Sequence, residues 1–221
     1  MKLLVNALSK VIAGFALILL LLFLPAGTMN YPGGWLFTCA LFIPMVPAGI
    51  VMLLKSPDLL KKRLSAKEKQ KEQSLVIKLS GLMFLLGFIS AGISYRYTFL
   101  LMPRPLSLCA LVVFVLSYLM YFEVLRENAY LSRTIEVHYG QKVIDTGLYG
   151  IIRHPMYTAT IFMFLSIPFI LSSWLSLIFF LFYPLLIILR LKNEEKVLEE
   201  ELTGYKEYKN KVRFRLIPFI W

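Results

Sequence analysis

Long apolar runs, separated by short charged segments, dominate the pattern along the chain. Several of these runs approach or exceed the ~18–20 apolar residues that cross a hydrocarbon core. We predict helices over roughly 11–27, 35–54, 75–95, 106–125, 157–171 and 174–191. The pattern therefore predicts an all-α, multi-pass membrane protein with about six transmembrane helices.

The composition agrees with this class of protein. Of the 221 residues, 58% are hydrophobic, and the mean hydropathy is +0.71. A soluble domain of this length would carry more charge and fewer long apolar runs. The first run follows Lys2 and Lys10, as in a signal peptide, but it is long for such a segment. Because "LPAGTMN" offers no small-x-small cleavage site, we expect a retained first helix.

The net charge of +11 would suit a nucleic-acid-binding protein, but its distribution indicates membrane topology instead. With a cytoplasmic N-terminus, the cytoplasmic segments hold 22 of the 24 basic residues, and only Arg96 and Arg104 lie outside. This bias predicts that both termini are cytoplasmic. We therefore expect membrane lipids, and not nucleic acid, as partners. The membrane is the plasma or inner membrane in a prokaryote and the endoplasmic reticulum in a eukaryote.

Three polar segments are predicted on the cytoplasmic side. The basic loop 55–74 reads as a short interfacial amphipathic helix that opens with Ser56-Pro57-Asp58. The second segment, 126–153, contains His138 and leads into His154, and the third runs from Arg190 to the end. We divide the chain into N-terminal helices over 1–125 and a C-terminal region over 126–221, which together form one structural domain.

The last two spans are short and joined by "LSSW" at 171–174, which predicts a tight turn between the arms of a helical hairpin. Pro168 and Pro184 each remove a backbone donor and can bend these helices. Two ordinary short helices with tolerated prolines are the alternative. Beyond the hairpin, apolar residues recur every three to four positions and predict a cytoplasmic amphipathic helix, broken near Gly204.

The two cysteines suggest no special chemistry. Cys39 and Cys109 lie inside apolar runs, so we expect two buried thiols. Neither their number nor their spacing indicates a disulfide framework or a metal site.

Taken singly, the polar residues at the membrane boundary are weak indicators of function. Arg190 and Glu194 share a helix face and can pair, but an arginine at a span end commonly snorkels to the interface. Tyr149 and Tyr157 suit an aromatic belt, and His154 suits an interfacial residue bonded to backbone. Proline at the first turn of a helix leaves free amide groups, here predicted near Met156 and Tyr157.

The combination is more specific than its parts. It consists of Gly147-x-Tyr149, Arg153-His154-Pro155-x-Tyr157, Arg190-x-x-x-Glu194-Glu195 and the Tyr205-x-x-Tyr208…Pro218 tail. Over residues 120–221 the chain resembles the integral-membrane methyltransferases that include isoprenylcysteine carboxyl methyltransferases and phospholipid N-methyltransferases. Ala159 stands where many relatives carry glycine, so a small residue is kept at that position.

The resemblance implies an S-adenosylmethionine site at the cytoplasmic ends of the last helices. Carried over by position, Glu194 would bind a polar end of the cofactor, and Arg190 would face a lipid-like or prenylated acceptor. The other implied cofactor-binding residues are Gln141, Lys142, Val143, Ile144, Tyr149, His154, Pro155, Met156 and Tyr157. These groups complement the carboxylate, the ammonium and the sulfonium of the cofactor.

Methyl transfer depends more on alignment than on acid–base chemistry. A carboxylate acceptor is already ionised, and Arg190 would orient it as a catalytic residue. An amine acceptor would have to lose a proton, for which Glu195 is the candidate base. The sequence predicts a membrane methyltransferase most like the isoprenylcysteine carboxyl enzymes.

Three alternatives stay open. The first is a phospholipid amine N-methyltransferase. The second is an NADPH-dependent sterol-type membrane reductase, although "RHPMY" lacks the asparagine that those enzymes tend to carry before the tyrosine. The third is a non-catalytic protein whose basic loops bind lipids or a partner. Quinone-like lipids and hydrophobic thiols are also possible methyl acceptors.

Overall fold

The computed structural model describes residues 2–64, 71–131, 134–135, 137 and 139–221, and these form helices without any strand. Residues 65–70 of the basic loop and His138 lie outside the described residues. The helices are α1 (Lys2–Ala26), α2 (Pro32–Lys55), α3 (Pro57–Leu64), α4 (Lys71–Arg96), α5 (Arg104–Glu127), the 3-10 turn η1 (Gly147–Gly150), α6 (Pro155–Ile170), α7 (Trp174–Phe180), α8 (Tyr183–Glu201) and α9 (Tyr205–Lys211).

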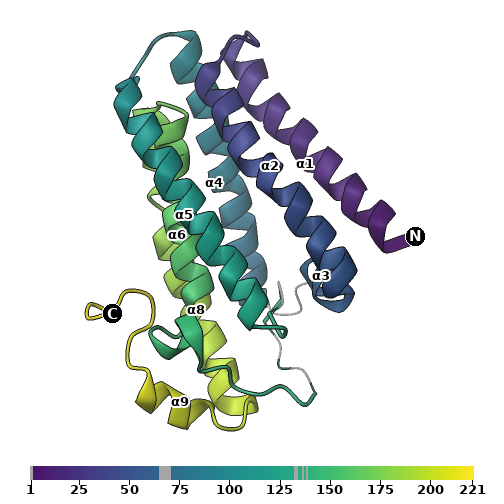
Figure 1. The fold of residues 1–221 in the computed structure, drawn as a ribbon. Coiled ribbons are helices and arrows are strands. Elements are labelled where there is room, and N and C mark those ends of the chain that lie inside the picture. Colours follow the sequence, from purple (N-terminus) through teal and green to yellow (C-terminus); the bar gives the residue numbers. More distant parts are fainter. Residues whose placement is uncertain (1, 65–70, 132–133, 136, 138) are drawn as a thin grey trace.

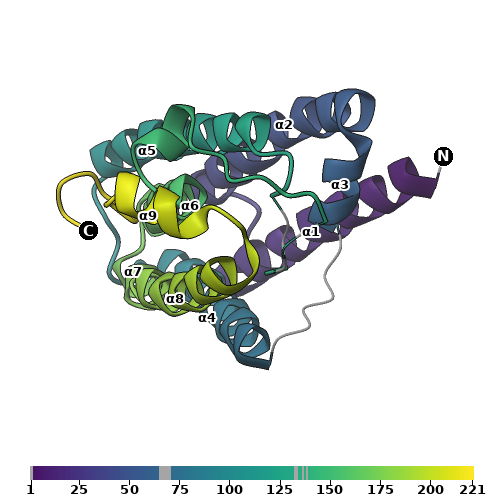
Figure 2. The same cartoon turned by 90° about the horizontal axis from the view of Figure 1, so that it is seen from below.

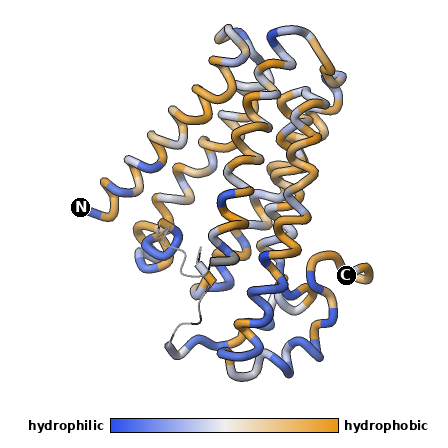
Figure 3. Tube along the Cα trace, turned by 180° about the vertical axis from the view of Figure 1, so that it is seen from behind, coloured by the Kyte–Doolittle hydropathy of each residue, from blue (hydrophilic) through white to orange (hydrophobic). Residues whose placement is uncertain are grey.

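The long helices form an elongated bundle, and the polar connections gather at one of its ends (Figure 1). That end carries α3, the segment that follows α5, and α9. Figure 3 shows that hydrophilic residues concentrate there, while the rest of the bundle is mostly hydrophobic. Seen from below, α9 lies across the end of the bundle (Figure 2), and it contacts α8. The polar segments predicted on one side of the membrane therefore lie at one end of the structure.

Five of the described helical stretches are long and apolar enough to cross a membrane, and α6 is a shorter apolar helix. The prediction of an all-α, multi-pass membrane protein is confirmed. The first helix begins at Lys2, nine positions before the predicted start at residue 11. Lys10 interrupts the apolar run, but a charged side chain on an exposed face does not interrupt backbone hydrogen bonding.

The predicted hairpin is present. α6 ends at Ile170, and α7 begins at Trp174 after a turn in which Ser172 adopts a positive φ of 57°. The turn is tied to the α4–α5 connection, since Met102 N donates to Ser172 O at 2.9 Å. Pro168 is accommodated inside α6, whereas Pro184 follows the break between α7 and α8. The second arm is therefore two consecutive helices.

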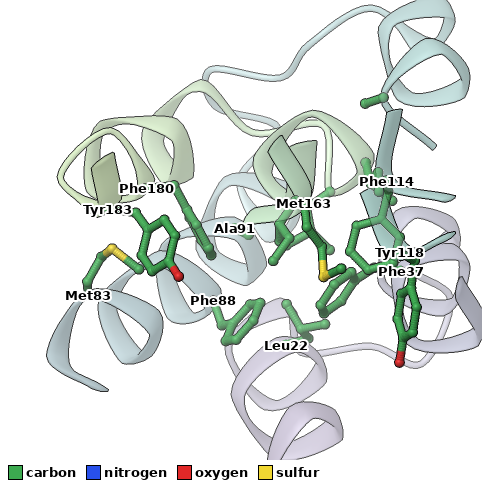
Figure 4. Packing of buried hydrophobic residues seen from close by; sticks show 14 of the residues in the cluster. Leu22, Phe37, Met83, Phe88, Ala91, Phe114, Tyr118, Met163, Phe180 and Tyr183 are labelled. Carbon is green, nitrogen blue, oxygen red and sulfur yellow. The ribbon is translucent and has the colours of Figure 1, made fainter. Parts of the chain in front are cut away.

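The core between α1, α2, α4, α5, α6, α7 and α8 is rich in aromatic residues (Figure 4). Glycines on α4 let neighbouring helices approach closely. A Cβ at Gly87 would lie 2.5 Å from the Phe180 ring, and one at Gly92 would lie 2.5 Å from the backbone oxygen of Leu22. Small residues at helix contacts are the usual means of packing within a membrane.

The prediction of two buried thiols was wrong. Cys39 and Cys109 are both exposed on the helical bundle. An apolar run gives no periodicity that separates lipid-facing from core-facing positions, because both environments favour apolar side chains. Burial of a particular residue in such a run therefore cannot be derived from hydropathy.

The predicted break in the C-terminal amphipathic helix is also present. α8 ends at Glu201, and α9 begins at Tyr205 after Gly204, whose φ is +87°. This left-handed conformation strains residues with a side chain, so glycine is favoured there. The turn folds α9 back under α8 and brings Tyr205 and Tyr208 against Leu198 and Val143.

Candidate active site

A cavity lies at the polar end of the bundle, where the segment after α5 crosses beneath α6 and α8. We call it the loop-side cavity. Its volume is about 880 Å³ when the open mouth is included. The residues that line it are Asn128, Tyr130, Leu131, Thr134, Ile135, Gln141, Lys142, Val143, Ile144, Tyr149, Arg153, His154, Met156, Tyr157, Arg190, Glu194, Val197, Leu198, Leu202, Tyr205 and Tyr208.

The start of α6 is fixed by the C-terminal tail. Arg153 N donates to Phe214 O at 2.9 Å, and His154 N donates to Arg215 O at 3.0 Å. The Thr158 hydroxyl then donates to Leu216 O at 2.7 Å. These bonds hold the Arg-His-Pro segment against a stretch about sixty residues later in the chain. The tail therefore forms part of the framework of the site.

Glu195 accepts hydrogen bonds from two arginines and faces a histidine. Arg153 Nε donates to Oε1 at 2.7 Å, and Arg215 Nε donates to Oε2 at 2.9 Å. His154 Nε2 lies 3.3 Å from Oε1. The Arg153 and Glu195 side chains are only 3% and 5% exposed. A carboxylate stabilised in this way is a weak proton acceptor.

The hydroxyl of Tyr157 connects α6 to two charged residues of α8. It donates to Glu194 Oε2, and it accepts from Arg190 Nε at 3.0 Å. The sequence placed Arg190 and Glu194 on one helix face. The structure adds that a tyrosine from the opposite arm of the hairpin lies between them.

Tyr149 is held by bonds at both its hydroxyl and its backbone. Its hydroxyl oxygen accepts from Asn128 Nδ2 at 3.0 Å, and its carbonyl accepts from the Tyr208 hydroxyl at 2.7 Å. Burial raises the pKa of Tyr149 well above its ordinary value, although the bond from Asn128 acts in the opposite direction. The phenol therefore stays neutral and serves as a hydrogen-bonding group.

The structure brings most of the residues in the predicted site around the loop-side cavity. Those that line it are Gln141, Lys142, Val143, Ile144, Tyr149, His154, Met156, Tyr157, Arg190 and Glu194. Pro155 and Glu195 are buried next to lining residues and are not among them. Of the two amides expected to be free at the start of α6, that of Tyr157 instead donates to His154 O at 3.0 Å.

Sequence reasoning assigned no role to several residues that also line the cavity. Tyr205 and Tyr208 were part of the matched tail motif, and their spacing along an amphipathic helix was the available signal. Tyr205 is 4% exposed, and its buried hydroxyl has no hydrogen-bond partner in the part of the chain that the structure describes. A buried donor of this kind indicates a place for a ligand acceptor.

A second cavity lies between the helices, on the membrane side of Tyr157. We call it the membrane-side cavity, and its volume is about 1130 Å³ with its open mouth. It is lined by Arg63, Val76, Ile77, Ser80, Gly81, Phe84, Tyr121, Met156, Tyr157, Thr160, Phe164, Tyr183, Ile187 and Arg190. Met156, Tyr157 and Arg190 line both cavities and therefore form the wall between them.

Together, the fold and the two cavities define a helical membrane protein with a polar site at one end and an adjoining apolar chamber. Residues 106–203 match the model of the phospholipid methyltransferase family. The predicted resemblance to the integral-membrane methyltransferases is thereby confirmed over this part of the chain, and the match supports a membrane methyltransferase.

One curated relative is Delta(14)-sterol reductase TM7SF2 from Mus musculus. It is 30% identical over 91 residues, which are 40% of this chain and 22% of the relative. The matched stretch thus represents only about a fifth of the length of that protein.

Proposed function

We propose that the protein is an S-adenosylmethionine-dependent methyltransferase acting on a lipid-like or amphipathic acceptor, most like the isoprenylcysteine carboxyl methyltransferases. The observation that carries this proposal is the wall of Met156, Tyr157 and Arg190 shared by the two cavities. A soluble methyl donor on one side and an apolar acceptor on the other would meet at this wall. The family match over residues 106–203 supports the same reaction class.

The loop-side cavity has the chemical groups that this cofactor requires. The unpartnered hydroxyl of Tyr205 would donate to an acceptor atom of the cofactor, and Glu194 would accept from one of its donors. Leu198 and Leu202 offer apolar surface for its ring system. Tyr149 and Tyr157 present aromatic faces that suit a sulfonium cation. We assign the remaining predicted cofactor contacts to Gln141, Lys142, Val143, Ile144, His154, Pro155 and Met156.

The cofactor, when bound, supplies a methyl group on a positively charged sulfur. In this proposal Arg190 orients the acceptor, because it lines the membrane-side cavity and is held by Tyr157. The contacts of Glu195 favour a structural role, since Arg153, Arg215 and His154 already surround its carboxylate. The reaction then depends on alignment of the acceptor and the methyl group.

We further propose that both termini and the loop-side cavity face the cytoplasm. The gathering of polar segments at one end of the bundle and the bias of basic residues toward these segments support this orientation. The soluble donor would then enter from water and the acceptor laterally from the bilayer.

The test of the cofactor site is binding of S-adenosylmethionine to the purified protein. Affinity should fall by at least tenfold in a His154→Ala, Tyr157→Ala double variant, as expected for the loss of charge-assisted contacts. Transfer of a labelled methyl group to a membrane extract, followed by mass analysis, would then identify the acceptor. Unchanged tight binding in the double variant would overturn the assigned site.

The similarity to a sterol reductase keeps a reductase as the second candidate. Among the described residues that line the loop-side cavity, the cations are Lys142, Arg153 and Arg190. Arg153 is paired with Glu195, and Arg190 is bonded to Tyr157. This arrangement favours a methyltransferase over a reductase, because a reductase would need a site for the extra phosphate of NADPH. Loss of nicotinamide absorbance with a sterol-like substrate would favour the reductase instead.

A further inference from the structure

A third cavity lies at the end of the bundle opposite the loop-side cavity. We call it the far-end cavity, and its volume is about 1200 Å³ with its open mouth. It lies where the start of α2, the α4–α5 connection and the hairpin turn meet, far from α9 (Figure 1). Its lining residues are Tyr31, Pro32, Gly33, Leu36, Tyr95, Leu101, Met102, Arg104, Ser107, Leu108, Ile170 and Ser172. None of these belongs to the proposed methyl-transfer site, so the far-end cavity requires a separate explanation.

The walls of the far-end cavity are held by contacts between separate helices. The Tyr31 hydroxyl donates to Leu171 O at 2.7 Å, and the Tyr31 ring stacks on that of Tyr95 with the centroids 4.2 Å apart. On the other side, Ser107 Oγ donates to Phe169 O at 2.9 Å. These contacts join α2, α4 and α5 to the end of α6 and the hairpin turn. The cavity is therefore preformed, as sites for small molecules usually are.

Polarity falls along one wall of the far-end cavity. Arg104 is the first residue of α5, and Ser107 and Leu108 follow three and four positions later on the same face. Because an α-helix rises about 1.5 Å per residue, Leu108 lies roughly 6 Å further along the apolar length of the helix than Arg104. Leu36 and Ile170 extend the apolar part of the lining. The cavity thus combines a charged rim with an apolar interior, which suits an amphiphile.

The part of the chain that surrounds Arg104 carries no acidic residue. The sequence holds no Asp or Glu in 1–57, 73–122 or 146–193, and these ranges contain every helix end around the cavity. Arg96, the other arginine at this end, lies with its guanidinium 5.6 Å from the Tyr97 ring centroid and does not line the cavity. A counter-charge for Arg104 must therefore come from outside the chain.

We propose that the far-end cavity binds an anionic phospholipid, with Arg104 on the phosphate and an acyl chain in the apolar interior. A guanidinium binds phosphate oxygens through paired, charge-assisted hydrogen bonds. A zwitterionic lipid also carries an ammonium group, for which the described lining offers no carboxylate. The bound lipid belongs to the leaflet away from the loop-side cavity, so it is not the methyl acceptor. The proposal goes beyond the methyltransferase function and does not depend on it.

Tryptophan fluorescence gives a local measurement of lipid binding at this end. Trp35, in the first turn of α2, and Trp174, at the start of α7, are both exposed. The third tryptophan, Trp221, is replaced by phenylalanine so that these two are the reporters. Phosphatidylglycerol and phosphatidylcholine with identical brominated acyl chains are titrated into the full-length protein in uncharged detergent. Phosphatidylglycerol should reach half-maximal quenching at a concentration about tenfold lower, as expected for a charge-assisted contact.

Matched variants in the same background separate the role of Arg104 from a general attraction to charge. Arg104→Gln should abolish the preference for phosphatidylglycerol, whereas Arg104→Lys should keep part of it, because it retains the charge without the planar fork. Arg96→Gln removes a charge from the same end outside the cavity and should keep the full preference. Thermal unfolding without lipid identifies any loss of structure. A folded Arg104→Gln protein that keeps the preference, or an equal loss in Arg96→Gln, would overturn the proposal.

Glycerol phosphate distinguishes a lipid site from a site for a soluble anion. It carries the anionic group without acyl chains, so it should not relieve the quenching by phosphatidylglycerol at comparable concentrations, because burial of the chain contributes to lipid binding. Displacement of the lipid at such concentrations would overturn the lipid as the occupant. Equal quenching of the wild-type site by the two brominated lipids would show a non-selective apolar contact and would overturn the role of Arg104.

Discussion

Arg153 and Glu195 form a buried ion pair across the two arms of the helical hairpin, with Nε and Oε1 2.7 Å apart. The arginine also donates from Nη1 to the backbone oxygens of Val212 and Arg213, each at 2.8 Å. One side chain thereby connects α8 to the C-terminal tail. The pair stabilises the framework behind the loop-side cavity, next to His154.

Glu195→Gln should therefore destabilise the protein strongly. The substitution leaves Arg153 buried without its counter-charge, which costs about 3–5 kcal/mol when one partner of a buried pair is removed. Unfolding in detergent, followed by helical circular dichroism and by affinity for S-adenosylhomocysteine, would measure the loss. A stable variant with normal cofactor affinity would contradict the structural role.

Glu199→Gln is the matched control for this prediction. Glu199 pairs with Lys209 at the polar end of the molecule, where the two side chains are 31% and 36% exposed. Solvent-exposed pairs contribute up to about 1 kcal/mol. The control should therefore unfold nearly as the wild type does.

Much of the fold could be predicted because hydrophobic length is a strong constraint in a membrane. The apolar spans, the hairpin and the break at Gly204 follow from apolar runs and from residues with restricted backbones, whereas the break between α7 and α8 was not predicted. Which face of each helix packs against the core could not be predicted, as the exposed Cys39 and Cys109 illustrate. The pairing of residues 153–154 with 214–215 also gave no local signal, since it joins two irregular segments.

Tyr157→Phe should reduce methyl transfer about tenfold while leaving the fold intact. Its hydroxyl is the group through which Arg190 and Glu194 are connected, and one charge-assisted hydrogen bond contributes about 1.5–3 kcal/mol. The measurement is transfer of labelled methyl at saturating concentrations of both substrates. Tyr118→Phe, which loses a hydroxyl bonded to Leu41 O on a different pair of helices, should keep the wild-type rate. Equal rates in the two variants would contradict the role of the hydroxyl.

The residues of the candidate site could be predicted more readily than the contacts between them. Motif spacing identified His154, Tyr157 and Arg190 as parts of one site, and the structure brings them around one cavity. Sequence reasoning assigned a cofactor contact to Glu194 and the role of candidate base to Glu195, but it did not reveal the contacts of Glu195 with Arg153, His154 and Arg215. Neighbouring residues of a helix point about 100° apart, so Glu194 lines the cavity, whereas Glu195 does not line it and pairs with Arg153.

Tyr205→Phe should weaken cofactor binding without destabilising the protein. Its hydroxyl is buried and lacks a partner among the described residues, so its removal relieves a desolvation cost in the ligand-free state. Loss of a hydrogen bond of about 1 kcal/mol to the ligand should lower affinity for S-adenosylhomocysteine roughly fivefold. Titration calorimetry and thermal unfolding would measure the two effects. Unchanged affinity would remove Tyr205 from the cofactor site.

Tyr208→Phe, in the same helix as Tyr205, should instead destabilise the protein. The Tyr208 hydroxyl donates to Tyr149 O at 2.7 Å, so its loss leaves a buried carbonyl without this donor. Stability should fall by about 1–3 kcal/mol. Affinity for S-adenosylhomocysteine should change mainly because Tyr149 is displaced. A variant more stable than the wild type would contradict this assignment.

Gly92→Ala should destabilise the contact between α1 and α4. The added methyl would lie 2.5 Å from Leu22 O, so the backbones must move apart, and overpacking of this kind costs about 1–3 kcal/mol. Gly49→Ala is the matched control, because no atom lies within 4 Å of a Cβ built at that helical position. The higher helix propensity of alanine should make the control neutral or slightly more stable. Thermal unfolding of both variants in the same detergent measures the difference, and equal stability would show that α1 does not approach α4 this closely.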